Sequence, residues 1–396
     1  MNPTAFPTEF PSAFIITVAV ILGALVGSFT NVLIYRIPRG ESIAFPPSHC
    51  PNCNHQLHPM DLFPVFSWLL LGGKCRYCRA PISAQYPIIE TISAIGYGLL
   101  AYFFPIQDVG ASLLGLFFFF TVLLAISVID LQTYTIPDSL SLVGLLVGLG
   151  FAWVNEKQGG YFFHLPGVKD AFTAALYGAG ILALVGNLGS YLLRRFREAK
   201  YPSFPIDYQT LNLGALVGMW LGPWWAAGAV LLAMLINFAM RRYLRIPDFI
   251  TFPGILISLV VKVNMGLDAN LITTMLTTLQ GLMAGAGIAS LIAGFYWWLA
   301  PEVEEDIAEE DLDPIAMGFG DVKLMAMIGA FVGVSNVFVS LALAIFLGAI
   351  LGILIYAVSK NRRIKFGPFL ALGGFVALLY GPQITDWYTG MLLGGM

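Results

Sequence analysis

Aspartates at the ends of apolar runs are the residues of this sequence best placed to do acid–base chemistry. Asp130 follows the apolar run 110–129, and Asp321 opens another apolar run directly after Gly318 and Gly320. Ionisable side chains are costly near hydrocarbon, so their default interpretation is functional. Two carboxylates held together in such a medium would share one proton, so that one could activate water while the other acts as an acid in amide hydrolysis.

Each aspartate also has a structural interpretation. Asp130 could face the lipid head groups or cap the following turn, and Asp321 could cap a helix N-terminus. Capping does not require two glycines, whereas glycines permit a positive φ and the close approach of another chain. We therefore favour a catalytic role for the pair.

The tripeptide Ile-Pro-Asp occurs twice, at 136–138 and 246–248, each time before an apolar run. Proline presets a helix start and aspartate caps it, so the tripeptide alone predicts only the start of a helix. Seven residues before the proline, the first copy has Asp130 and the second has Met240. The first copy is predicted to belong to the active site, with Asp138 in a supporting role, and the second to keep only the turn.

The four cysteines form two C-x-x-C pairs, Cys50 with Cys53 and Cys75 with Cys78. Four thiolates give Zn²⁺ a closed tetrahedral shell, and each C-x-x-C turn supplies two of them. A closed shell leaves no position for catalysis. The metal is therefore predicted to be structural, and folding of the loop to depend on it.

Composition predicts the fold class. Hydrophobic residues make up 58% and charged residues 11% of the chain, whereas soluble domains carry about 25% charged residues. We expect an all-α polytopic membrane protein with about 10–12 transmembrane or half-depth helices and a small cytoplasmic zinc-ribbon-like loop domain. The runs 211–240 and 322–357 are expected to break at Gly222-Pro223 and near Gly333. The net charge of −3 gives no reason to expect a nucleic-acid partner.

Lys and Arg predict the orientation. Most of them lie at Lys323 or in clusters at 36–79, 194–200, 241–245 and 360–365. Placing these on the cytoplasmic side puts the N-terminus outside. It puts the cysteine loop and both candidate catalytic aspartates inside.

An internal repeat relates the segments 171–264 and 271–381. The string YGAGILAL corresponds to AGAGIASL, and LGALVG corresponds to IGAFVG. A tandem duplication of a four-helix unit explains the match. The predicted organisation is a first transmembrane helix (1–36), a Cys₄ zinc loop (37–86), which the family resemblance described next associates with methyl transfer, helices with the first catalytic aspartate (87–160), an inserted degenerate repeat (171–264) and helices with Asp321 and its two preceding glycines (271–396).

Several motifs together resemble those of the bacterial type IV prepilin peptidases, which are leader peptidase/N-methyltransferases of the GxGD membrane aspartyl protease group. In the N-terminal part these are GSFTNVLIYRIPRGE, CPNC, CRYCRAPIS and YPIIE. Further on, IDLQTYTIPD looks like the D-x₆-P-D motif of that family, GFGDVKL like its GxGD motif and KFGPFLALG like a third landmark. The resemblance covers about 1–150 and 315–381.

The resemblance implies a multi-pass enzyme of the cytoplasmic (inner) membrane. It would cut the leader from prepilins and pseudopilins on the cytoplasmic side, and it would methylate the new amino terminus with S-adenosylmethionine. Asp130 and Asp321 would be the catalytic pair and the four cysteines the Zn²⁺ ligands. Gly318, Gly320, Asp138 and Lys323 would support the pair, and the residues that bind the methyl donor are not identified.

The chain departs from the family pattern in spacing. Asp130 and Asp321 are 191 positions apart because the segment 171–264 intervenes. Asp207, which stands near the GxGD position of the first repeat without its glycines, and Asp248 are therefore rivals for a place in the site. Two other functions stay open at this point: a peptidase without methylation, and a transporter, since internal repeats are typical of transporters.

Overall fold

The structure, a computed structural model, describes residues 12–158, 164–198, 204–241, 246–265, 271–300, 313–359 and 365–393. These residues are mostly helical, and no strand occurs among them beyond two isolated bridges. Nine of the described helices are long and apolar enough to cross a membrane. The chain is thus an all-α, multi-pass membrane protein, as expected from its composition. Parts of the basic clusters lie outside the described residues, so the orientation stays a prediction.

The chain divides into two compact units. The first unit contains Met1–Pro137 with Trp153–Leu165, and the second contains Asp138–Ala152 with Pro166–Met396. Helix α6 (Asp138–Lys157) contributes to both units.

In the first unit, α1 (Ser12–Arg36) packs along α3 (Gln85–Phe103). Two glycines of α1 permit this approach. A methyl group added at Gly23 would lie 2.7 Å from the carbonyl oxygen of Ser93, and one added at Gly27 would lie 2.8 Å from the Cα of Glu90. The remaining elements are η1 (Ile37–Arg39), η2 (Pro59–Asp61), α2 (Phe66–Leu70), α4 (Ile106–Val109) and α5 (Ser112–Thr133).

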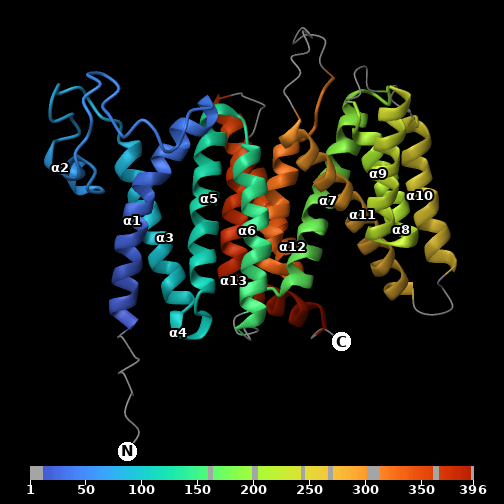
Figure 1. The fold of residues 1–396 in the computed structure, drawn as a ribbon. Coiled ribbons are helices and arrows are strands. Elements are labelled where there is room, and N and C mark those ends of the chain that lie inside the picture. The colour runs from blue at the N-terminus through green and yellow to red at the C-terminus, as the bar shows by residue number, and fades with distance from the viewer. Residues whose placement is uncertain are drawn as a thin grey trace, which may run out of the picture. The chain divides into compact units, whose positions relative to one another are not determined.

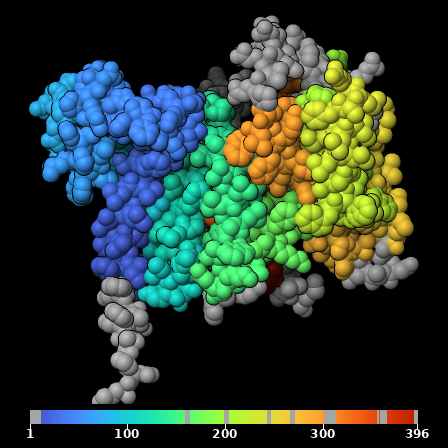
Figure 2. All heavy atoms as spheres, in the orientation of Figure 1, coloured from blue at the N-terminus to red at the C-terminus, as the bar shows by residue number. Residues whose placement is uncertain are grey.

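The cysteine loop, residues 37–84, connects α1 to α3 (Figure 1). In the space-filling view it forms a rounded body beside one end of α1 (Figure 2). The loop has little regular structure, so metal ligands and side-chain hydrogen bonds have to hold it.

The second unit consists of helices of 14 to 41 residues. Its helices besides α6 are α7 (Val168–Leu193), α8 (Tyr208–Leu221), α9 (Pro223–Met240), α10 (Asp248–Met265), α11 (Leu271–Leu299), α12 (Phe319–Ser359) and α13 (Gly367–Leu393).

Both predicted helix interruptions are present. Gly222 separates α8 from α9 with φ 92° and ψ 173°, and Gly333 breaks α12 with φ 79° and ψ 173°. Only glycine adopts such a backbone conformation without strain. The two breaks have nearly the same geometry, and each follows a helical segment of 14 residues, Tyr208–Leu221 in the first repeat and 319–332 in the second.

Helices α7 and α11 approach each other backbone to backbone. A methyl group added at Gly180 would collide with the carbonyl oxygen of Met283, and one added at Gly287 would collide with that of Leu176. Gly287 and Met283 occupy the positions in the second repeat that Gly180 and Leu176 occupy in the first. The contact is therefore reciprocal, as in an interface with two-fold symmetry.

The same reciprocity extends to the short helices. Helix α7 packs against the first part of α12 through Gly178 and Gly329, and α11 packs against α8 through the matching Gly285 and Gly214. Each long helix thus packs mainly on the short helix of the other repeat. These contacts favour the duplication of a helical unit, while its boundaries at 171–264 and 271–381 stay a prediction.

Replacing Gly180 by alanine is expected to lower the free energy of unfolding by ~1–3 kcal/mol, because the added methyl meets a backbone oxygen of α11. The measurement is the midpoint of thermal unfolding in detergent, followed by circular dichroism. Gly228→Ala is the matched control, since nothing lies within 4 Å of a methyl group added there. Equal midpoints for the two variants would contradict the α7–α11 contact.

Candidate functional site

The four cysteines of the loop form one cluster. Their sulfur atoms all lie within 4.8 Å of one another, and the sulfurs of Cys50 and Cys78 are 3.8 Å apart. Cys50 and Cys75 are buried, whereas Cys53 is exposed. The cluster could hold a metal ion, and four thiols at this separation match the ligand set of a tetrahedral, thiolate-bound metal.

Two similar backbone turns present these cysteines. In the first turn the N–H of Asn54 donates to the carbonyl of Cys50 at 2.8 Å, and in the second the N–H of Arg79 donates to that of Cys75 at 3.0 Å. Asn54 and Arg79 both have a positive φ, of 54° and 61°. Each turn thus brings both sulfurs of its C-x-x-C pair to the same cluster.

Local hydrogen bonds favour the metal-binding form of one thiol. A backbone hydrogen bond at Ala80 and a second from the Asn52 amide, 3.6 Å from the sulfur, lower the pKa of Cys78 to about 6. The thiolate is the form that binds metals. The loop thus offers a ligand that is largely deprotonated near neutral pH.

Asp61 holds η2 beside the second cysteine turn. Its carboxylate accepts hydrogen bonds from Arg76 at 2.6 Å and from the Tyr77 hydroxyl at 2.9 Å. Partial burial opposes ionisation, but the hydrogen bonds from Arg76, Tyr77 and the backbone of His58 outweigh it and lower the pKa of Asp61. Asp61 is therefore ionised at neutral pH.

Asp130 lies in the last turn of α5, in the first unit, and it is buried. The helix ends at Thr133, and the next residue, Tyr134, has φ 58° and donates its N–H to the carbonyl of Asp130 at 3.0 Å. This left-handed end turns the chain toward the Ile-Pro-Asp segment and α6. A buried carboxyl group at such an end is positioned by the helix and not by a loop.

Asp321 lies in the first turn of α12, in the second unit, and it is partly buried. Its N–H donates to the carbonyl of Gly318 at 3.2 Å. Neither Gly318 nor Gly320 has a positive φ, so the conformational reason expected for these glycines is wrong. A methyl group at Gly318 would lie 3.4 Å from a carboxylate oxygen of Asp321, an ordinary contact distance.

Lys323, two residues after Asp321, is buried and forms an ion pair with Asp138. Its methylene stem packs at Gly294 of α11, where an added methyl would lie 3.3 Å from the Lys323 Cδ. Its ammonium group lies 5.1 Å from the centre of the Phe319 ring. The structure thus brings the Asp of the first Ile-Pro-Asp segment to the helix that carries the GxGD motif.

The two rival aspartates have structural contacts. Asp207 caps α8, and its carboxylate accepts the N–H of Gln209 at 2.8 Å. Asp248, which is buried, forms an ion pair with Arg194 at 3.3 Å. Sequence reasoning missed this pairing because 54 residues separate its members and nothing in the pattern links them.

Sequence reasoning also missed Glu90. This residue is buried in the second turn of α3, and its carboxylate accepts the backbone N–H of Val65 at 2.7 Å. The contact ties the cysteine loop to α3. An acidic residue in an otherwise apolar run was the signal that could have found it.

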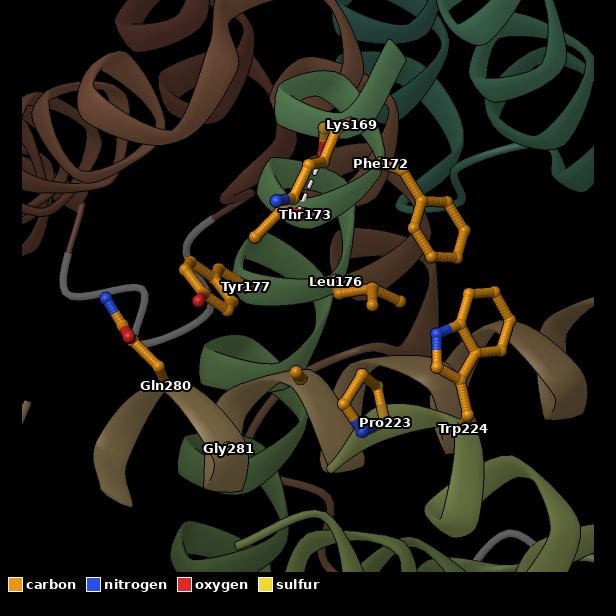
Figure 3. A pocket seen from close by; sticks show the side chains of 10 residues that line it. Lys169, Phe172, Thr173, Leu176, Tyr177, Pro223, Trp224, Gln280 and Gly281 are labelled. Atoms are coloured by element: carbon orange, nitrogen blue, oxygen red, sulfur yellow. Dashed lines mark hydrogen bonds between the residues drawn. The ribbon is translucent and has the colours of Figure 1, made fainter. Parts of the chain in front are cut away.

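A pocket of about 360 Å³ lies between α7, α9 and α11 (Figure 3). Its lining is largely apolar, with Phe172, Leu176 and Trp224, and Lys169 and Gln280 add polar groups. None of the candidate site residues lines it.

Comparison with known families gives the assignment. The model for the "Bacterial Peptidase A24 N-terminal domain" matches residues 21–104. The model for the "Type IV leader peptidase family" matches 117–240 and again 241–353, which together are more than half of the chain. The chain belongs to the type IV leader peptidase family. It is therefore an enzyme, of an aspartic peptidase family, and the transporter alternative is set aside.

Named relatives agree with the leader peptidase assignment. A "Prepilin leader peptidase/N-methyltransferase" of Burkholderia pseudomallei is 36% identical over 256 residues, covering 58% of this chain and 74% of the relative. One of Stutzerimonas stutzeri is 26% identical over 414 residues and covers 98% of both chains. A "Type 4 prepilin-like proteins leader peptide-processing enzyme" of Escherichia coli is 31% identical over 223 residues, 52% of this chain and 76% of the relative. No solved structure matches.

The two matches to the leader peptidase family divide the motifs between them. The first match contains Asp130 and the first Ile-Pro-Asp, and the second contains the other Ile-Pro-Asp and the GxGD motif. Each matched segment therefore carries one of the two candidate catalytic aspartates.

The cysteine cluster predicts one metal ion per chain in protein purified without chelator, measured by elemental analysis. Cys75→Ser is expected to lose the metal and to make the loop 37–84 sensitive to protease, because three thiolates no longer close the shell. His49→Ala is the control and should keep the metal, since the four sulfurs already complete the shell. Full metal content in the Cys75→Ser variant would refute the cluster as the binding site.

Proposed function

We propose that this protein cleaves the leader peptide from type IV prepilins and pseudopilins, and that it then methylates the new amino terminus. The names of its relatives, which combine both activities, support this assignment. We place the reaction at the cytoplasmic face of the inner membrane because the clusters of Lys and Arg favour that side for the cysteine loop and for Asp321.

We assign the cleavage to Asp130 and Asp321. The ionised carboxylate takes a proton from water as the water oxygen forms a bond to the scissile carbonyl carbon. The protonated one gives its proton to the amide nitrogen as the C–N bond breaks, which releases the leader as a carboxylic acid and the pilin as an amine. The pair holds one proton before and after the reaction, so neither acid is consumed.

The observation that carries this assignment is the ion pair between Lys323 and Asp138. Lys323 follows Asp321 by two residues, and Asp138 follows Asp130 by eight. A buried ammonium group needs a fixed counter-ion, because an unpaired buried charge destabilises the fold. Within the second unit the pair therefore fixes the start of α6 relative to the helix that carries Asp321, and we propose that this contact helps to position the two acids.

The cysteine cluster and the methyl donor belong to the second activity. We propose that Cys50, Cys53, Cys75 and Cys78 hold a structural Zn²⁺, which would crosslink the two turns of the loop. S-adenosylmethionine, the donor expected from the family, supplies the methyl group when bound. We assign none of the described residues to it.

Asp130→Asn and Asp321→Asn are each expected to reduce leader cleavage by at least ~10³-fold, because an amide can neither activate water nor donate a carboxyl proton. The assay follows the mass of a prepilin incubated with the solubilised protein. Asp207→Asn is the matched control: asparagine caps a helix as well as aspartate does, so this variant should cleave normally. Normal cleavage by the Asp321→Asn variant would refute the two-aspartate assignment.

Lys323→Met is expected to reduce kcat for cleavage by ~10–100-fold with little change in KM. Lys323→Arg keeps the charge and is the matched control, which should retain most of the cleavage rate. A Lys323→Met variant with the kcat of the unchanged protein would argue against the positioning role.

A further inference from the structure

Five large apolar side chains in the segment 59–73 of the cysteine loop are exposed, each by 58% or more. They are Met60, Phe63, Phe66, Leu69 and Leu70, which we call the loop patch. Adjacent exposed apolar side chains of this size mark an interaction surface. The segment they share, 59–73, contains a single charged residue, Asp61, and that residue is engaged by Arg76.

Helix α2 is built to present this patch. Phe66, Leu69 and Leu70 have the i, i+3, i+4 spacing that places side chains on one face, and the Phe63 ring lies 5.7 Å from that of Phe66. Trp68 points elsewhere. Its indole N–H donates to the carbonyl of Ile82 at 3.1 Å, and its ring closes over Gly73. The tryptophan anchors the helix to the rest of the loop, so the apolar face stays outward.

The patch is fixed to the helices of the first unit. Glu90 in the second turn of α3 accepts the N–H of Val65, the residue before α2, at 2.7 Å. Val65 has φ 63°, which is unfavourable for a β-branched residue and persists only where the surroundings hold it. The start of α2 is therefore bound within two turns of the start of α3, at the end of a helix that packs along the membrane helix α1.

The charge of the loop fits a membrane surface. Residues 37–84 carry four basic and two acidic side chains. Lys74 and Arg79 are exposed. Because Asp61 pairs with Arg76, it does not neutralise the positive charge of Lys74 or of Arg79. Anionic lipids of the cytoplasmic leaflet attract such residues, and apolar side chains beside them enter the boundary between head groups and acyl chains.

We propose that the loop patch inserts into the cytoplasmic leaflet, with Lys74 and Arg79 against anionic lipid head groups. The occupant of the patch is thus the lipid bilayer and not a second protein chain. Docking at the leaflet would hold the metal-binding loop at the membrane surface. At the membrane surface the new amino terminus of a membrane-embedded pilin becomes available for methylation. This consequence rests on the proposed function.

The first experiment places benzoylphenylalanine at Leu70 in the full-length protein, reconstituted in nanodiscs of phosphatidylethanolamine with phosphatidylglycerol. The expected result after irradiation is a lipid adduct, detected by mass spectrometry. The same probe at Gln56, an exposed polar position of the same loop, is the control and should give at least ~10-fold less adduct. Equal lipid adducts at the two positions, or an adduct at Leu70 only with added prepilin, would overturn the proposal.

The second experiment measures the consequence for activity in the double variant Phe66→Glu, Leu70→Glu. Methylation of a cleaved pilin is expected to fall ~10-fold, while leader cleavage and metal content stay at the level of a Gln56→Glu control. Unchanged methylation would overturn membrane docking as a requirement. A wild-type protein that does not methylate at all would refute the proposed second activity, and the crosslinking experiment would still decide the lipid contact.

Discussion

The backbone contact between α7 and α11 at Gly180 and Gly287 is the constraint on which the second unit depends. Lipid tails are as apolar as leucine, so helices in a membrane associate through close packing and not through burial from water. Glycines at matching positions of the two repeats allow this packing. Once the long helices are fixed to each other, each offers its remaining glycine face to the short helix of the other repeat.

Because each long helix packs on the short helix of the other repeat, the two repeats have different roles. The helix with the GxGD motif rests on α7, whereas α8, α9 and α10 gather around α11. An ion pair between Arg194, at the end of α7, and Asp248 of α10 joins this second group to α7, as the pair of Lys323 and Asp138 joins α12 to α6. Hydrogen bonds from Asn187 to Asn212, and from Asn212 to Thr251, extend it. Such a buried polar network contributes specificity of packing more than stability, which suits a scaffold.

The sequence predicted the features that depend on local chemistry. The cysteine spacing predicted the cluster, and the glycines at 222 and 333 predicted the helix breaks, because a positive φ is a local requirement. Partner choice between helices was not predictable. Helices that are apolar on every side lack the amphipathic pattern from which a buried face is inferred. The packing of α8 on α11, and of α12 on α7, therefore left no periodic signal in the sequence. The Glu90–Val65 contact joins a loop to a helix through one side chain, which no spacing rule describes.

The break at Gly333 leaves the GxGD part of α12 only 14 residues long, from Phe319 to Val332. At 1.5 Å per residue this part spans about 21 Å, less than the ~30 Å thickness of the hydrocarbon. Residues 322–332 are all buried, so protein and not lipid surrounds this half-depth helix. A break in the backbone at membrane depth is tolerated only in such surroundings, and the chain that passes through Gly333 therefore depends on its neighbouring helices for its place in the bilayer.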